Sequence, residues 1–119
     1  NADSVLTMMK IYDTEILTFG DATKEAEDDV VRKFGIRDID IVKLSHHGSK
    51  TSSSKYYLTS INPSIAIISS GRNNRFKHPS SETIQNLEEL KIKYLNTQES
   101  GTIEFVISKK GVTYNEYKP

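Results

Sequence analysis

Apolar, β-prone segments alternate with segments of helical periodicity along this 119-residue chain, and this order constrains the fold more than any other feature. The segments typical of strands are residues 4–12, 16–19, 39–44, 65–69, 93–95, 101–108 and 111–117. Helices are predicted over 22–34, from a serine cap within 52–54 to 61, and from Ser80 or Ser81 to 90. This order predicts an α/β fold in which helices cover a sheet and the last two strands form a hairpin.

The predicted helix over 22–34 carries its apolar residues at helical spacing. One face is therefore expected to be buried, with the acidic side chains in solvent. The residues expected to be buried are Ala26, Val30, Val31 and Phe34, and those expected to be exposed are Glu25, Glu27, Asp28 and Asp29. Gly35 is expected to end the helix.

The composition excludes several classes of protein. Hydrophobic residues make up 35% and charged residues 27% of the chain, which is typical of a folded domain. Its apolar runs are far shorter than the roughly 20 residues that a bilayer requires. The absence of cysteine excludes disulfides and thiolate metal ligands, and the net charge of +0 gives no overall attraction to nucleic acid.

Three polar loops follow strands of the predicted sheet, and two of them contain all of the histidines. Asp21 follows the second strand, His46 and His47 follow the third, and His78 lies in the loop after the fourth. Ligand sites of α/β sheets lie at the carboxyl ends of strands, so these side chains are expected to converge. Each also has a plainer interpretation, with Asp21 as a helix N-cap and the histidines as ordinary surface loop residues.

Aspartate and histidine together are typical ligands of divalent metals, and one aspartate can bridge two ions. Two neighbouring metals can clamp a phosphodiester and activate the attacking water. The nearby Ser49, Lys50, Arg72 and Asn73 suit contacts with phosphate. A two-metal site needs more protein ligands than this chain offers at these positions, so the sequence predicts half of such a site.

Four segments of the chain carry a family resemblance: FGDATKEAE, DIVKLSHHGSKTSSS, INPSIAIISSGRNNRFKHP and LNTQESGTI. In this order and spacing they resemble the C-terminal half of the metallo-β-lactamase-like domain of ComEC proteins, the competence membrane proteins that take up transforming DNA. The resemblance implies an αββα sandwich, of which residues 1–119 would form roughly the C-terminal ββα half. Where the family commonly has LLTGD, this chain has TFGD, and it lacks the N-terminal metal motif H-x-H/D-x-D-H. A C-terminal piece of a larger membrane protein is therefore expected.

The resemblance implies roles for individual residues. Asp21 would bridge the metals, and His46 or His47 would be the last metal ligand, with His46 preferred because it lies nearer the strand end. His78 would be catalytic, protonating the leaving oxygen or holding the phosphate. The residues expected to contact the substrate are Ser49, Lys50, Arg72 and Asn73.

The implied activity is metal-dependent phosphodiester hydrolysis by a nuclease that acts on transforming DNA, with zinc or manganese in a two-metal site. The implied location is a soluble domain of a bacterial cell-membrane protein, on the outer face of the cytoplasmic membrane. The expected partners are DNA, the N-terminal half of the same domain, and a second copy of this chain bound through the face that the missing half would cover. With few of the ligands, the chain alone is expected to be inactive and to bind metal weakly or not at all. Two alternatives remain open: a hydrolase of small phosphodiesters such as phosphorylcholine esters, and a non-catalytic interaction domain.

Overall fold

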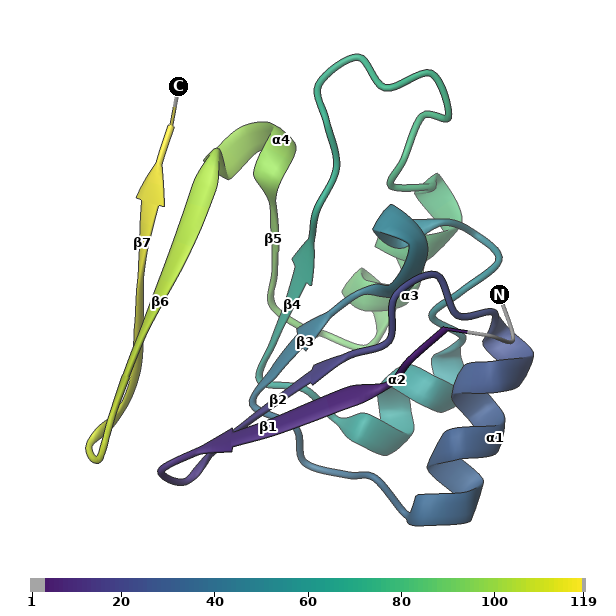
Figure 1. The fold of residues 1–119 in the computed structure, drawn as a ribbon. Helices are drawn as coiled ribbons and strands as arrows, with labels where there is room; N and C mark the ends of the chain where they lie inside the picture. Colours follow the sequence, from purple (N-terminus) through teal and green to yellow (C-terminus); the bar gives the residue numbers. More distant parts are fainter. Residues whose placement is uncertain (1–3, 119) are drawn as a thin grey trace.

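The strands form two separate sheets in the computed structural model, which describes residues 4–118. One sheet has the order β1-β2-β3-β4-β5, and a two-stranded hairpin stands beside it (Figure 1). The strands are β1 (Thr7–Ile11), β2 (Thr14–Thr18), β3 (Ile41–Lys43), β4 (Ile65–Ile68), β5 (Tyr94–Asn96), β6 (Thr102–Ser108) and β7 (Gly111–Tyr117). The helices are α1 (Lys24–Phe34), α2 (Lys55–Ile61), α3 (Ser81–Glu89) and α4 (Thr97–Ser100), with a tight 3₁₀-type turn, η1 (Ser45–Gly48). The predicted α/β fold and final hairpin are confirmed, while η1 and α4 are short elements that the sequence pattern did not predict.

Parallel pairing sets the direction of the central strands. β2, β3, β4 and β5 run parallel to one another, and β1 pairs antiparallel with β2. The register aligns Leu17 with Val42 and Val42 with Ala66. Parallel neighbours end at the same edge of a sheet, so the loops after β2, β3 and β4 all leave from that edge. The loop after β4 extends furthest beyond it (Figure 1).

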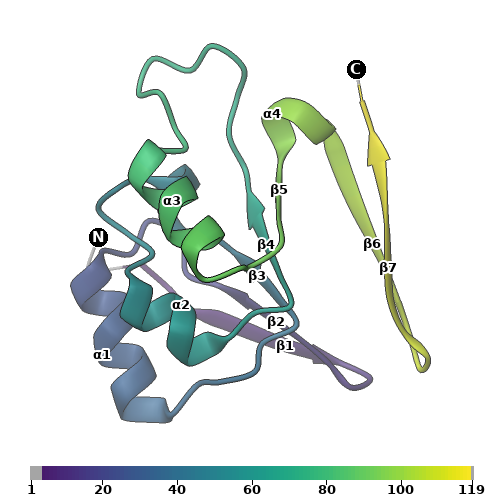
Figure 2. The ribbon, with the colours of Figure 1, turned by 180° about the vertical axis from the view of Figure 1, so that it is seen from behind.

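Helices α1, α2 and α3 cover one face of the sheet (Figures 1 and 2). The core beneath them contains Leu17, Val42 and Ala66 from the strands and Leu58 and Leu87 from the helices, each 0% exposed. Burying a leucine-sized side chain contributes roughly 1.5–3 kcal/mol. This layer therefore holds the strands in the register that positions the loops at their carboxyl ends.

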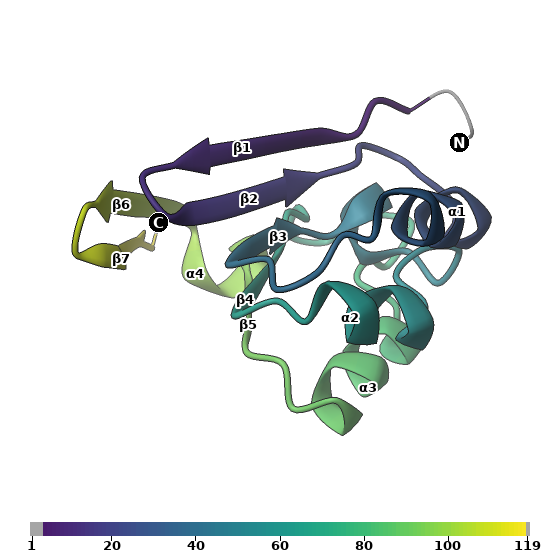
Figure 3. The same ribbon diagram turned by 90° about the horizontal axis from the view of Figure 1, so that it is seen from below.

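The opposite face of the sheet is only partly covered. Ile16, Ile67 and Leu95 point to this side, because they alternate with the core row along their strands, and they are half-buried. The β6–β7 hairpin lies on this side, away from the helices, and its Phe105 is half-buried (Figure 3). Parallel strands are usually covered on both faces, so this face is suited to contact with further protein.

Caps fix the ends of the helices. The Thr23 side chain accepts a hydrogen bond from the first turn of α1, and Gly35, with a φ of 62°, ends that helix. Ser54 caps α2 and Ser80 caps α3, in agreement with the predicted serine caps. Because Thr23 occupies the N-cap position of α1, the interpretation of Asp21 as that N-cap is wrong.

The helices are short. The longest of those described, α1, has 11 residues. Within residues 4–118, no helix has the length and apolar character needed to cross a membrane.

Two expectations for α1 are wrong. Phe34 was expected to be buried but is 67% exposed, because it lies at the last position of the helix and beyond the core. Glu27 was expected to be exposed but is 0% exposed. It lies one helical turn before the buried Val31, and therefore on the same face. Its Oε1 accepts a hydrogen bond of 2.6 Å from the backbone N–H of Ser53.

The buried Glu27 predicts a pH-dependent stability. Burial raises the pKa of its carboxyl from 4.5 to about 7; the hydroxyl of Ser45, the backbone N–H of Ser53 and the charge of Lys24 oppose the rise, and the charge of Asp28 adds to it. A carboxyl with a higher pKa in the folded than in the unfolded state favours folding at low pH. For this group, the free energy of unfolding should fall by about 3 kcal/mol as the pH rises from about 4 to about 8.

Glu27→Gln removes this contribution. The difference between wild type and this variant, measured by urea unfolding across that pH range, isolates Glu27 because all other ionisable groups are common to both proteins. Glu25→Gln, which changes an exposed carboxylate of the same helix, is the matched control and should follow wild type. Equal pH dependence in wild type and Glu27→Gln would contradict the prediction.

Candidate functional site

Three loops at the carboxyl edge of the sheet bring Asp21, His46, His47 and His78 to one cavity of about 330 Å³. Asp21 follows β2, the two histidines follow β3, and His78 lies in the loop after β4. The cavity is also lined by Ser70, Gly71, Asn74 and Phe76. Residues separated by as many as 57 positions in the sequence, the difference between 78 and 21, therefore share one site.

The three imidazoles form a compact cluster. The ring centroids of His46 and His78 are 5.5 Å apart, and each of these rings lies 6.4 Å from that of His47. Phe76 lies nearly parallel to His78, with a centroid distance of 5.9 Å and an interplanar angle of 17°. One exposed aromatic ring and three proton-carrying rings thus border the same cavity.

The backbone of the histidine pair is held in a sparsely populated conformation. His46 and His47 have φ values of 51° and 54°, in the left-handed region that favours glycine. Such residues cost of order 1 kcal/mol or more each and persist where the surrounding structure fixes them. One such contact is the hydrogen bond of 2.9 Å that the His46 N–H donates to the Gly20 carbonyl. This bond ties the histidine turn to the residue preceding Asp21.

The two neighbouring histidines differ in orientation. His47 Nδ1 lies 2.7 Å from the carbonyl oxygen of Ser69, and because a carbonyl only accepts, this nitrogen donates. In the neutral imidazole, Nε2 of His47 then carries the lone pair, the usual arrangement in a histidine that binds a metal. His46 Nδ1 has only a longer contact of 3.4 Å with the Thr51 hydroxyl. The geometry thus favours His47 as a ligand, whereas proximity to the strand end favoured His46.

The environment of His78 favours its neutral form. Burial lowers the pKa of its imidazole, and the neighbouring His46 and His47 lower it further. Its Nδ1 is buried and has no hydrogen-bond partner among the described residues. A neutral imidazole can accept a proton, but it must first gain one before it can protonate a leaving oxygen. A bound phosphate would supply the negative charge that raises this pKa.

Two amide side chains hold His78 in place. Nδ2 of Asn74 donates to the carbonyl oxygen of His78 at 2.9 Å, and Oδ1 of Asn74 accepts the His78 N–H at 2.7 Å. Nε2 of Gln98 donates to the carbonyl oxygens of both Gly71 and His78, at 2.7 and 2.9 Å. Sequence reasoning missed Gln98, because it lies on α4 and no local pattern links it to the loop. It also missed Phe76, for which the only signal was a single aromatic residue in an otherwise polar loop.

The residues predicted to contact substrate are placed differently from the histidines. Ser49 is buried, and its hydroxyl bonds to the Thr51 hydroxyl within the loop at 3.0 Å. Lys50 is exposed, Arg72 Nε donates to the Gln98 carbonyl at 3.3 Å, and Asn73 lines a neighbouring cavity of about 480 Å³. As far as the described residues show, none of these four lines the histidine cavity. Ser49 in particular faces inward because its hydroxyl closes the loop.

The carboxylate and imidazole groups of the histidine cavity are of the types that bind divalent metals, but the described side chains are not arranged as a set of three or more ligands. Carboxylate and imidazole are common ligands of zinc and manganese. Within residues 4–118, however, no group of three or more histidine, cysteine, aspartate or glutamate side chains is arranged to hold a metal ion.

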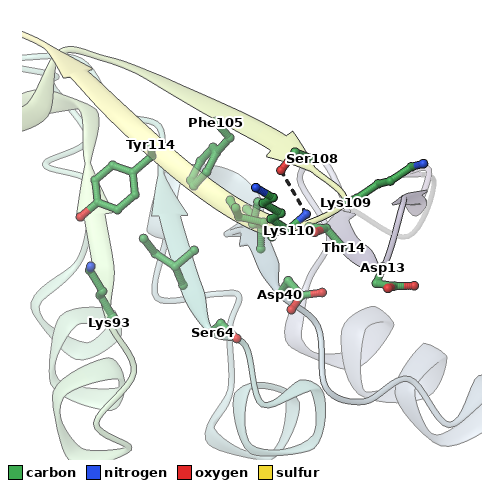
Figure 4. A pocket seen from close by; sticks show the side chains of 14 residues that line it. Asp13, Thr14, Asp40, Ser64, Lys93, Phe105, Ser108, Lys109, Lys110 and Tyr114 are labelled. Atoms are coloured by element: carbon green, nitrogen blue, oxygen red, sulfur yellow. Dashed lines mark hydrogen bonds between the residues drawn. The ribbon is translucent and has the colours of Figure 1, made fainter.

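A larger cavity, of about 490 Å³, lies between the hairpin and the other end of the sheet (Figure 4). It reaches the first residues of β2, β3 and β4, and its charged side chains are those of Asp13, Asp40, Lys93, Lys109 and Lys110. None of the chain's histidines lines it. Although it is larger, this cavity lacks the imidazoles that distinguish the histidine cavity.

Comparison with protein-family models gives no match for this chain. The chain is 34% identical to ComE operon protein 3 of Bacillus subtilis, over 100% of this chain and 15% of that protein. It is 37% identical to Recombination protein 2 of Haemophilus influenzae, over 87% of this chain and 13% of that protein. It is 38% identical to Competence protein ComA of Neisseria gonorrhoeae, over 82% of this chain and 14% of that protein. The chain is homologous to a segment of these proteins.

This homology confirms the resemblance to competence proteins over most of the chain. The chain spans 13–15% of the length of these relatives, so it corresponds to a small part of each of them. The relation to a metallo-β-lactamase-like half-domain stays a prediction.

The geometry predicts that Gly48 controls how closely the two histidine loops approach. Gly48 has a φ of 79°, and a Cβ at this position would lie 2.8 Å from Cβ of Pro79, next to His78. Gly48→Ala should therefore lower the free energy of unfolding by about 1–3 kcal/mol and displace His78 from His46. Urea unfolding and NMR contacts between the two imidazoles measure these effects.

Gly71→Ala is the matched control, because a Cβ there meets nothing within 4 Å. It should change neither the stability nor the contact between the imidazoles. If Gly48→Ala behaved like Gly71→Ala, the close approach at Pro79 would not be what sets the spacing of the loops.

Proposed function

We propose that this chain supplies part of a hydrolytic site that cleaves phosphodiester bonds of DNA during uptake by a competence protein. The observation that carries the proposal is the convergence of Asp21, His46, His47 and His78 on one cavity from three separate loops. The homology to competence proteins supports DNA as the substrate. In this proposal the chain is the C-terminal half of a metallo-β-lactamase-like domain.

Each residue of the cavity has a chemistry suited to this role. Asp21 and His47 would be this chain's contribution to a site for a divalent metal, zinc or manganese, that is completed by residues outside the chain. His78, held neutral beside two other imidazoles, would take a proton from the attacking water and deliver it to the leaving oxygen. Asn74 and Gln98 would keep its backbone in place during that transfer.

The partly covered face of the sheet supports the proposed domain organisation. Ile16, Ile67 and Leu95 form an incompletely buried apolar surface on the side away from the helices. The N-terminal half of the domain would cover this surface in the longer protein, and a second copy of the chain would cover it when the chain is alone. The domain would lie outside the bilayer, on the outer face of the cytoplasmic membrane, where it meets incoming DNA.

The proposal predicts that two residues of the cavity are needed for cleavage. In a protein extended to the length of the relatives, Asp21→Ala and His47→Ala should each lower manganese- or zinc-dependent cleavage of single-stranded DNA by roughly 100-fold or more. Lys109→Ala, at the other cavity, is the control and should leave cleavage unchanged. Cleavage that survives both substitutions would exclude this site, and an extended, folded protein without any cleavage would favour an interaction domain.

A substitution at Phe76 distinguishes DNA from small phosphodiesters as the substrate. Its ring is 70% exposed at the edge of the histidine cavity, where a base next to a bound phosphate can stack on it. Phe76→Ala should therefore lower kcat/KM for single-stranded DNA roughly tenfold, and leave a phosphodiester without a base unaffected. Phe34→Ala, at an exposed aromatic residue on α1, is the matched control. An equal loss with both substrates would contradict base stacking and favour a hydrolase of small phosphodiesters.

A further inference from the structure

A carboxyl group lies inside the core beneath the segment 45–53, which contains His46 and His47 and is called the histidine loop below. Glu27 is 0% exposed, and its Oε1 accepts a hydrogen bond of 2.6 Å from the backbone N–H of Ser53, 26 residues away. A buried carboxyl loses the hydration that stabilises its charge, and an apolar residue here would extend the packing around Val31. Stability alone therefore does not explain a glutamate at this position.

Other buried polar atoms surround this carboxyl. Oε2 of Glu27 and the hydroxyl oxygens of Ser45, Ser53 and Tyr57 are buried and have no hydrogen-bond partner within the described residues. The Ser45 hydroxyl is near enough to stabilise the charged form of Glu27, although its geometry does not complete a hydrogen bond. Burial raises the pKa of the Tyr57 phenol, and the charge of Glu27 raises it further. Buried polar atoms are normally paired, so an unpaired carboxyl oxygen with three unpaired hydroxyls near it marks a polar centre within the core.

This polar centre joins the two ends of the histidine loop. Ser45 immediately precedes His46, and Ser53 lies six residues after His47, the difference between 53 and 47. His46, His47 and Ser53 all have positive φ values, of 51°, 54° and 60°. Backbone in this region relaxes unless contacts from outside the loop hold it. Glu27 provides such a contact from α1 at the Ser53 end of the loop, and the Ser45 hydroxyl lies near it at the other end.

The same helix region holds the loop at further points. The Lys24 N–H donates to the Thr51 carbonyl at 2.9 Å, and the Ser54 hydroxyl donates to Asp28 at 2.8 Å. The bond between Glu27 and Ser53 is fully buried, as are the bonds that the Ser52 hydroxyl donates to the Ala22 carbonyl and the Thr83 hydroxyl donates to the Ser49 carbonyl. Because water competes less with a buried bond, the Glu27 contact is one of those expected to limit the movement of the loop, and it is the one made by an ionisable side chain.

We propose that Glu27 is a positioning residue that anchors the histidine loop at Ser53 and thereby helps to set the location of His46 and His47 relative to Asp21. The effect of Glu27 on the loop stands on the contacts described above. Its consequence for hydrolysis rests on the proposed function.

The test compares Glu27→Met with Glu27→Gln in this chain, by NMR. Methionine keeps the length of the side chain but removes the acceptor, whereas glutamine keeps an acceptor for the Ser53 N–H. In Glu27→Met, the Ser53 amide should exchange with solvent roughly 10- to 100-fold faster, relative to the β3 amides. The imidazole signals of His46 and His47 should shift as well. In Glu27→Gln, the Ser53 exchange rate and the imidazole signals should be close to those of wild type. Glu25→Gln, at an exposed position, should change neither the exchange rate nor the signals.

Unchanged Ser53 exchange and imidazole signals in a folded but less stable Glu27→Met would overturn the proposal, because Glu27 would then only support the core. If Glu27→Met does not fold, exchange in the wild-type chain decides. A Ser53 amide protected like those of β3 supports the anchor, and one that exchanges as fast as the exposed Lys50 amide overturns it. None of these measurements requires metal or DNA, so a failure of the anchor and a failure of the proposed hydrolysis are distinguishable.

Discussion

The parallel pairing of β2, β3 and β4 is the interaction on which the candidate site depends. Their register is set by the buried row of Leu17, Val42 and Ala66 beneath the helices. A slip of one residue would turn this row to the opposite face, and it would also shift a loop by about 3.3 Å along its strand. A cavity whose rings lie 5.5–6.4 Å apart would not survive such a shift. The apolar layer thus determines the geometry of the polar site.

The histidine loop shows a second constraint: its strained backbone lowers the stability of the fold, and it fixes the positions of His46 and His47. His46 and His47 occupy left-handed backbone conformations, which cost of order 1 kcal/mol or more each. They are held by bonds from other segments, including those to the Gly20 and Ser69 carbonyls. A buried carboxyl beneath the loop adds a further cost. Strain and buried charge in the same small region are typical of a site that must be preorganised.

Much of the fold follows from the sequence, because periodicity and caps are local. The strand and helix segments, the Ser54 and Ser80 caps and the final hairpin all lie where the pattern predicts them. The burial of Glu27 does not follow from the sequence. The sequence identifies a charged residue, but it cannot show that the Ser53 N–H binds this side chain in the core. Its spacing of four from Val31 was the available signal, and residue type outweighed it.

The candidate site was predictable only as a set of loops. Asp21 and the histidines could be grouped because parallel strands end together. The orientation of each ring could not be predicted, because the bond from His47 to Ser69 joins residues separated by 22 positions. Gln98 was beyond prediction for the same reason, because its bond to His78 joins residues 20 positions apart. The inward-facing Ser49 was missed although its partner, Thr51, is only two positions away.

The partly covered face of the sheet and the proposed metal site point to the same physical requirement. The apolar surface around Ile16, Ile67 and Leu95 gains stability when further protein covers it. A metal at the histidine cavity would need ligands beyond those arranged in residues 4–118. If one polypeptide segment supplies both, docking and metal binding are linked, and each strengthens the other by the same free energy. Metal affinity would then report assembly of the domain, and removal of the metal would weaken contacts far from the histidines.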